Sequence, residues 1–133
     1  MNSVAVRRAG IILSVEDVNV SSDFYVEHFG FSVEQKYDEP PYVILEGFGT
    51  RLSLSWHGNA ADDLQGYSQS PPVDPHNQAT MLVFEVANCD EAAATLTEAG
   101  VEMASAVFRP PWGGGRFFAL DPDGYLIEVE ELA

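Results

Sequence analysis

The segment Gly10-Ile11-Ile12-Leu13-Ser14-Val15-Glu16-Asp17 is followed about 70 residues later by a similar one, Met81-Leu82-Val83-Phe84-Glu85-Val86-Ala87-Asn88. Both segments are apolar runs of the kind that form buried strands. Each run stops at a residue that favours the start of a helix, because the side-chain oxygens of Asp17 and Asn88 can accept hydrogen bonds from free backbone N–H groups. The repeat therefore predicts two units with the same order of elements.

A helix is expected after each of these segments. Gly30 and Gly100 follow the last expected turns, where glycine adopts the left-handed backbone at little cost. Apolar residues recur at i and i+4 and again one turn later, at i+8 in the first helix and i+7 in the second, so each helix should bury one stripe. The predicted stripes are Val20, Phe24 and His28 in the first helix and Ala92, Leu96 and Ala99 in the second.

Three further strands are expected in each unit. They are predicted over residues 31–37, 42–46 and 51–56 in the first unit and over residues 101–108, 116–120 and 125–132 in the second. We expect an α+β fold in which two βαβββ modules, in pseudo-twofold repeat, form a curved mixed sheet with a cleft. The predicted organisation is a single domain over residues 1–133, with module one at about 6–56, a linker rich in Gly, Pro and Ser at 57–78, and module two at about 79–132.

Alternation along the strands assigns the side chains to two faces. Leu52, Leu54 and Trp56 share the face that should pack on a helix, so Trp56 is expected in the core. The other face should be open to solvent or to a cleft. It is predicted to carry Gly10, Ile12, Ser14, Tyr42, Ser53, Ser55, His57, Met81, Val83, Glu85, Phe117, Glu128 and Glu130.

The chain is strongly acidic, with 21 Asp and Glu against 6 Lys and Arg and a formal net charge of −15. Such a field repels phosphate backbones and anionic lipids, so neither nucleic acid nor membrane is an expected partner, whereas a cationic small molecule would be attracted. A simpler alternative is that the acidity only keeps the protein soluble. No apolar run approaches the roughly 20 residues that cross a bilayer, and a cytoplasmic location is the default expectation. The single cysteine, Cys89, is expected to be a packing residue.

Four segments carry a resemblance to a known family: Ser14-Val15-Glu16-Asp17, Asp23-Phe24-Tyr25, Phe29-Gly30-Phe31 and Phe118-Ala119-Leu120-Asp121-Pro122-Asp123-Gly124-Tyr125-Leu126-Ile127-Glu128. With them the chain resembles the vicinal-oxygen-chelate superfamily, which includes glyoxalase I, extradiol dioxygenases, methylmalonyl-CoA epimerase and bleomycin-resistance proteins. The resemblance covers nearly the whole chain and implies the fold expected above. It does not fix an activity, because one fold hosts many sites.

In the enzymes of that superfamily a divalent metal is held by four strand positions, usually His, Glu or Gln. The repeat places these positions at Gly10, Ser53, Met81 and Glu128, of which only Glu128 is a good donor. No metal or other cofactor is therefore expected. A register error of one residue, bringing in Ser14 or Glu85, would supply no histidine. His28, His57 and His76 lie off the ligand strands and are expected to be surface or packing residues, with an acid or base role for His57 left open.

The segment Pro110-Pro111-Trp112-Gly113-Gly114-Gly115 is similar to one in the antibiotic-binding branch of the superfamily. That similarity implies a homodimer with two crevices, each holding a cationic, flat-ringed drug without chemistry, in an antibiotic-resistance role. The residues predicted to bind the ligand are Trp112, Gly113, Tyr42, Phe117, Ser53, Ser55, His57, Met81 and Glu128. Two alternatives stay open: a metal-dependent lyase, epimerase or dioxygenase with misassigned ligands, and a regulatory or accessory protein that uses the fold only to dimerise.

Overall fold

The structure, a computed structural model, describes residues 2–133 and divides into two compact units with a boundary between Pro71 and Pro72. Within the described residues, neither helix has the length and apolar character needed to cross a membrane. Each unit combines one helix with one sheet, so the expected α+β class is confirmed.

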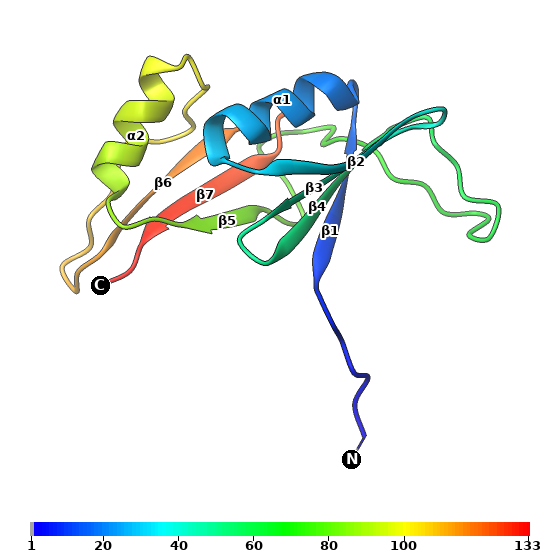
Figure 1. Cartoon of the computed structure of the whole chain (residues 1–133). Coiled ribbons are helices and arrows are strands. Elements are labelled where there is room, and N and C mark those ends of the chain that lie inside the picture. Colours follow the sequence, from blue (N-terminus) through cyan, green and yellow to red (C-terminus); the bar gives the residue numbers. More distant parts are fainter. Residues whose placement is uncertain (1) are drawn as a thin grey trace. The chain divides into compact units, whose positions relative to one another are not determined.

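The first unit has the predicted βαβββ order (Figure 1). Strand order in its sheet is β1-β4-β3-β2, with β1 and β4 parallel and the other neighbours antiparallel. The helix begins at Asp17, whose carboxylate accepts from the N–H groups of Asn19 and Val20, and ends at Gly30 in the left-handed conformation, as predicted. The elements are β1 (Gly10–Val15), α1 (Val18–Phe29), β2 (Ser32–Asp38), β3 (Pro41–Gly47) and β4 (Thr50–Trp56).

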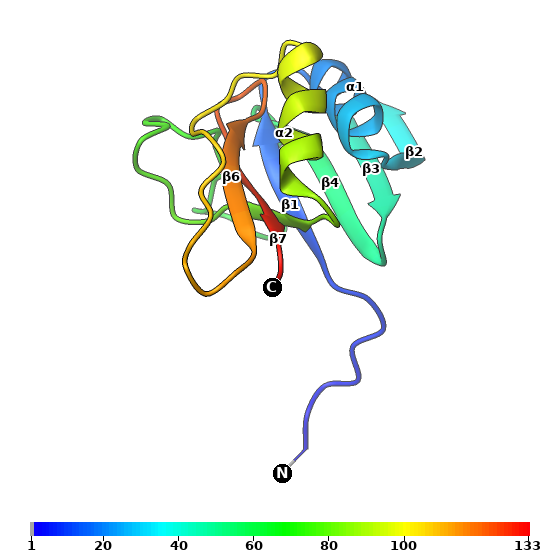
Figure 2. The same cartoon turned by 90° about the vertical axis from the view of Figure 1, so that its left-hand side faces the viewer.

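One face of this sheet is covered by α1, which contacts β3 and β4 (Figure 2). Leu52 and Leu54 are fully buried there, as their parity predicts. The predicted helix stripe is wrong, because Val20 is 51% exposed. The buried residues of α1 lie on a different face of the helix, with the spacing i, i+3, i+4 and i+7. Two of them are serines, so a search for apolar residues does not find this face. These residues are Val18, Ser21, Ser22 and Tyr25.

The second unit has a sheet of order β5-β7-β6, with β5 parallel and β6 antiparallel to β7. Its helix begins after Asn88, whose side chain accepts from the N–H of Glu91, and Gly100 follows it with φ of 81°. Cys89 and Leu96 are buried, but Ala99 is exposed, which corrects the second predicted stripe. The elements are β5 (Leu82–Glu85), α2 (Cys89–Glu98), β6 (Gly115–Leu120) and β7 (Leu126–Glu131).

The strand predicted over residues 101–108 is not a regular strand. It runs beside β6 with two isolated bridges, Met103 to Ala119 and Phe108 to Arg116. Between them the chain bends, and the N–H of Phe118 donates to the Ser105 hydroxyl at 2.9 Å in place of a backbone carbonyl. The hydroxyl of Ser105 thus takes the place of a backbone carbonyl between the two segments. Serine side chains often compete with backbone groups for hydrogen bonds in this way.

Two further side chains depart from their predicted faces. Phe117 is fully buried and paired with Val129 on the helix side, so its assignment to the open face is wrong by one residue. Phe118 is the residue opposite Glu128 on the open face. Trp56, expected in the core, is 39% exposed, and its ring lies against Gly58. Trp56 is the last residue of β4, where the strand ends. The pairing of β6 with β7 is regular, so Phe117 was placed on the wrong face by an error of one residue in the expected register.

Two glutamine side chains fasten the ends of the connection between the units, each within its own unit. Gln69 donates to the carbonyl of Ile12 at 2.7 Å, and its own carbonyl accepts from the Ser14 hydroxyl. Gln78 donates to the carbonyl of Gly124 at 2.6 Å and accepts from the N–H of Leu126. The free edge of β1 and the β6–β7 turn are thereby both capped by connection residues.

Candidate functional site

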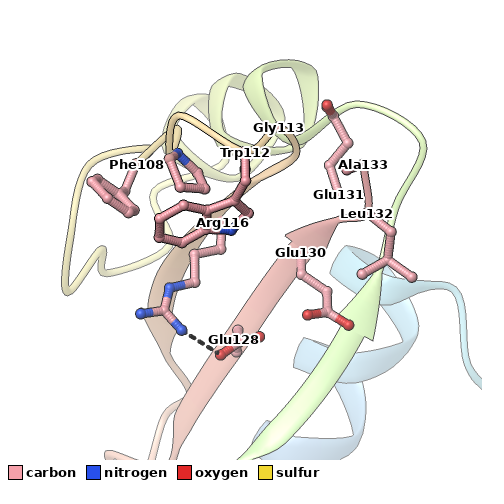
Figure 3. A pocket seen from close by; sticks show the side chains of 11 residues that line it. Phe108, Trp112, Gly113, Arg116, Glu128, Glu130, Glu131, Leu132 and Ala133 are labelled. Atoms are coloured by element: carbon pink, nitrogen blue, oxygen red, sulfur yellow. Dashed lines mark ion pairs between the residues drawn. The ribbon is translucent and has the colours of Figure 1, made fainter.

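A hollow of about 410 Å³ lies on the open face of the second unit (Figure 3). Its size is in the range of small-molecule sites. Aromatic and carboxylate side chains meet in it, which makes it suited to a ligand with both an apolar face and a charge. It is lined by Phe108, Pro110, Trp112, Gly113, Gly115, Arg116, Glu128, Glu130, Glu131, Leu132 and Ala133.

The Trp112 side chain stands on a loop whose backbone is fixed by glycines. Gly113 and Gly114 have φ of 101° and 76°, values that other residues adopt only with strain. A side chain at Gly114 would also place its Cβ 2.6 Å from the Glu131 carbonyl oxygen. The loop can therefore approach the end of β7 closely, while Trp112 remains 79% exposed. An indole held in this way is available to cover a ring.

Arg116 occupies the centre of the hollow, between the aromatic and acidic sides. Its guanidinium pairs with the Glu128 carboxylate at 3.6 Å, as the dashed line of Figure 3 marks, and lies 5.2 Å from the centre of the Phe118 ring. In the same view its stem runs below the Trp112 ring. Over half of the Arg116 side chain is exposed, whereas Glu128 is only 15% exposed. The less exposed Glu128 carboxylate is thus held in place, whereas the more exposed Arg116 guanidinium is free to move.

Glu128 and Glu130 are two residues apart on β7 and face the same side. The hydrogen bond between their side chains raises the pKa of Glu130 above its usual range, with desolvation and the charge of Glu128 adding to the effect and Arg116 opposing it. Two like charges this close favour retention of a proton. A cation entering the hollow would relieve their repulsion.

A second group of charged residues, centred on Arg109, lies next to the residues that line the hollow. The Arg109 guanidinium pairs with Asp90 at the start of α2 and, at 3.1 Å, with Glu131 on β7. Glu131 also accepts from the N–H of Cys89, and the hydrogen bond from Arg109 lowers the pKa of the Glu131 carboxyl. Cys89 is buried, as expected of a packing residue, and desolvation raises the pKa of its thiol. These contacts join the loop after residue 108, α2 and β7.

The four expected metal positions do not suit a divalent ion. A side chain at Gly10 would put its Cβ 2.5 Å from the Arg51 carbonyl oxygen, so no donor could stand there without a shift of backbone. Met81 offers a thioether and Ser53 a hydroxyl, both weak ligands for such ions. Glu128 is paired with Arg116. Within residues 2–133 no three His, Cys, Asp or Glu side chains come together as a metal site.

The other predicted binding residues are not in the lining of this hollow. Tyr42 and Ser53 line a different hollow, on the open face of the first unit. Ser55 lies beside them in register, and its hydroxyl accepts from the Asn59 amide. His57 pairs with Glu16 at 3.4 Å, and Met81, just before β5, is 44% exposed.

Phe108 and Arg116 line the hollow of the second unit but were not among the predicted binding residues. For Arg116 the signal was present in the sequence, because residues 116, 118 and 120 share the face opposite that of Phe117 and Ala119. Phe108 came from a segment whose irregular backbone gives no reliable parity. Its 55% exposure could be learned only from the structure.

Fold and site together define a small α+β protein with one helix and one sheet per unit and a ligand-sized hollow on an open sheet face. The model of the Glyoxalase/Bleomycin resistance protein/Dioxygenase superfamily matches residues 7–129, and the chain belongs to that superfamily. The resemblance found in the sequence is thereby confirmed.

Solved structures share the fold over nearly the whole chain. A superfamily member from Sphaerobacter thermophilus is 25% identical, with a TM-score of 0.69 and coverage of 96% of this chain and 98% of that one. A lactoylglutathione lyase from Agrobacterium tumefaciens (17% identity, TM-score 0.73, 97% and 95% covered) and TioX from Micromonospora sp. ML1 (19%, 0.71, 95% and 98%) share the fold. A comparison with curated proteins gives no match.

Proposed function

We propose that this protein binds a cationic, flat-ringed small molecule in the hollow of the second unit and sequesters it without chemical change, as an antibiotic-resistance protein of the bleomycin-resistance type. One observation carries the proposal: an exposed indole and two adjacent carboxylates border the same hollow. Trp112 is 79% exposed, and Glu128 and Glu130 form the acidic side.

The ring of the ligand would lie against Trp112, with Phe108 as a second apolar contact. A well-packed ring stack contributes about 0.5–1.5 kcal/mol beyond the burial of area. Gly113, beside the indole, leaves room for a ligand to approach the backbone. The cationic group would compete with Arg116 for Glu128 and Glu130. Since Arg116 is more exposed than Glu128, it can turn aside at little cost.

Sequestration is favoured over catalysis by the unsuitable donor set at the four metal positions. The formal net charge of −15 supports a cationic ligand over an anionic one at this hollow, because the field of the whole chain attracts cations.

The test is a titration with naphthylmethyl-trimethylammonium, a flat cation whose charge does not depend on pH, and with the neutral naphthamide. The amide NMR spectrum reports where each probe binds. We expect the cation to bind more tightly than the amide and to shift the signals of Gly113, Gly115 and Glu130. Trp112→Ala should weaken cation binding about two- to tenfold, and Glu128→Gln with Glu130→Gln should remove the preference for the cation.

Two matched variants serve as controls. Tyr67 is 78% exposed, close to the value for Trp112, but lies outside the hollow, so Tyr67→Ala should leave binding unchanged. Glu27→Gln, on the exposed side of α1, removes one carboxylate elsewhere, half of the change of charge in the double variant. Equal binding of the two probes, or turnover of a substrate that stops when a chelator is added, would refute sequestration of a cation. Bleomycin itself is the drug to test first in the same assay.

A further inference from the structure

The open face of the first unit carries a separate hollow of about 790 Å³. This volume is in the range of small-molecule sites. Apolar side chains form its floor, and three arginines lie along it. Its lining is Arg7, Arg8, Ala9, Gly10, Ile11, Ile12, Tyr42, Ile44, Arg51 and Ser53.

The charge of this hollow is opposite to that of the protein. The sequence has 6 Lys and Arg in total, and Arg7, Arg8 and Arg51 are gathered here. Glu34 is the one carboxylate in the described chain that pairs with these arginines, at 3.4 Å from Arg8 and 3.8 Å from Arg51. Three guanidiniums and one carboxylate leave an excess of positive charge on a chain that is otherwise strongly acidic.

The local backbone holds Arg51 in this position. Gly10 is its partner on the neighbouring strand, and a Cβ there would lie 2.8 Å from the Arg51 Cβ, so the glycine makes room for the arginine stem. Glu34 is the extra residue of a bulge in β2, a device that redirects a side chain. The Nε of Arg51 is buried and, within residues 2–133, makes no hydrogen bond, because the Glu34 carboxylate that pairs with it stays 3.8 Å away. A buried donor of this kind calls for an acceptor.

We propose that this hollow binds a small organic acid, with its carboxylate against the arginines and its apolar body on Ile12, Ile44 and the Tyr42 ring. Guanidinium groups match the planar geometry of a carboxylate and bind it with paired hydrogen bonds. Glu34, a carboxylate already lying between Arg8 and Arg51, shows that this chemistry suits the position. The Tyr42 and Ser53 hydroxyls, which both line the hollow, can donate to the same ligand.

The test uses naphthoate, the anionic member of the series that contains naphthamide, and follows the amide signals of the protein at neutral pH. We expect naphthoate to bind more tightly than naphthamide, to shift the signals of Gly10, Ile12 and Ser53, and to bind more weakly as salt is added. Arg51→Gln and Arg8→Gln should each weaken naphthoate binding about five- to tenfold. Glu34→Gln should strengthen it, because the competing carboxylate is removed.

Lys36→Gln removes one positive charge, as Arg51→Gln and Arg8→Gln do, but outside the hollow. It should therefore have little effect on naphthoate binding. The proposal is overturned if naphthoate and naphthamide bind equally, or if Arg51→Gln and Lys36→Gln weaken binding to the same extent. It is independent of the cation site, since Trp112→Ala tests only that site. Shifts confined to Gly113, Gly115 and Glu130 on addition of naphthoate would likewise overturn it.

Discussion

At the scale of single residues, the most consequential pair is Glu128 and Glu130. Their side chains share a hydrogen bond, and this bond is the largest cause of the raised pKa of Glu130. Folding therefore favours the protonated form of Glu130. The same proton is the one that a bound cation would displace, so binding and protonation oppose one another at this position.

This opposition predicts a pH dependence of stability. The contribution of Glu130 to the free energy of unfolding is complete below its ordinary pKa of about 4.3, and it is lost as the pH rises through the raised folded-state pKa. Glu130→Gln keeps a neutral hydrogen-bonding group at every pH. Relative to this variant, the parent should lose melting temperature as the pH rises from acid to neutral, while the exposed control Glu102→Gln should follow the parent. A constant difference between parent and Glu130→Gln across this range would contradict the shared proton.

A second prediction at the scale of single residues concerns the effect of Gly114 on stability. Gly114→Ala meets two obstacles, the positive φ and the 2.6 Å approach of its Cβ to the Glu131 carbonyl oxygen. We expect a loss of about 1–3 kcal/mol in the free energy of unfolding, measured by denaturant titration. Gly100 has a similar φ, and a Cβ added there would have no atom within 4 Å. Gly100→Ala therefore measures the part of the stability loss that comes from the positive φ alone. Equal losses in the two variants would show that the close approach to β7 carries no weight.

At the scale of elements, the Arg109 cluster joins three parts of the second unit. Arg109 lies on the irregular segment before β6, Asp90 in the first turn of α2 and Glu131 at the end of β7. Paired charges raise the pKa of Arg109 and lower that of Glu131. This cluster gives a segment without regular strand pairing a fixed place beside the hollow.

Arg109→Gln should lower the melting temperature at neutral pH, because Asp90 and Glu131 lose a common partner. The lowered pKa of Glu131 means that its contribution to stability is present above the ordinary carboxyl pKa and is lost as the pH falls through the depressed value. The difference between parent and variant should therefore shrink in acid. Thermal melts at several pH values test this, with Lys36→Gln as a charge control. A difference that persists unchanged in acid would assign the loss to packing instead.

Elements were also the scale at which the sequence was most informative. Apolar runs ending at Asp17 and Asn88 located both helix starts, and the parity of Leu52 and Leu54 located the core face. Prediction failed where a side chain replaced backbone pairing, as Ser105 does beside β6. For the site, Trp112 and Gly113 were named from the similarity of their segment to one in the antibiotic-binding branch, whereas the gathering of Arg7, Arg8 and Arg51 depends on strand register and the segment before β1. A single sequence contains no signal for that proximity.

At the scale of the whole molecule, each sheet exposes apolar side chains on its first strand. Ile12 on β1 and Val83 on β5 are 49% and 52% exposed. Exposed apolar side chains that form a contiguous patch often mark a contact with another chain. Together with the superfamily resemblance, this supports the proposal that the protein is a homodimer.

Light scattering after gel filtration tests the oligomeric state. We expect twice the mass of one chain for the parent and a shift toward one chain for Val83→Asp, because a buried carboxylate in an interface is costly. Val73→Asp, at a position 95% exposed in the connection, should leave the mass unchanged. A parent that elutes with the mass of one chain at all concentrations would contradict the dimer.

The side-chain amide hydrogen bonds of Gln69 and Gln78 have a consequence for engineering. Gln78 also donates to the Pro75 carbonyl at 3.1 Å, so only the stretch from Ser70 to Val73 can be cut, lengthened or replaced without loss of a contact of either glutamine. A fluorescent reporter placed there would leave the contacts of both hollows in place. A reporter inserted in this stretch is thus a practical route to a sensor for whatever these sheets hold.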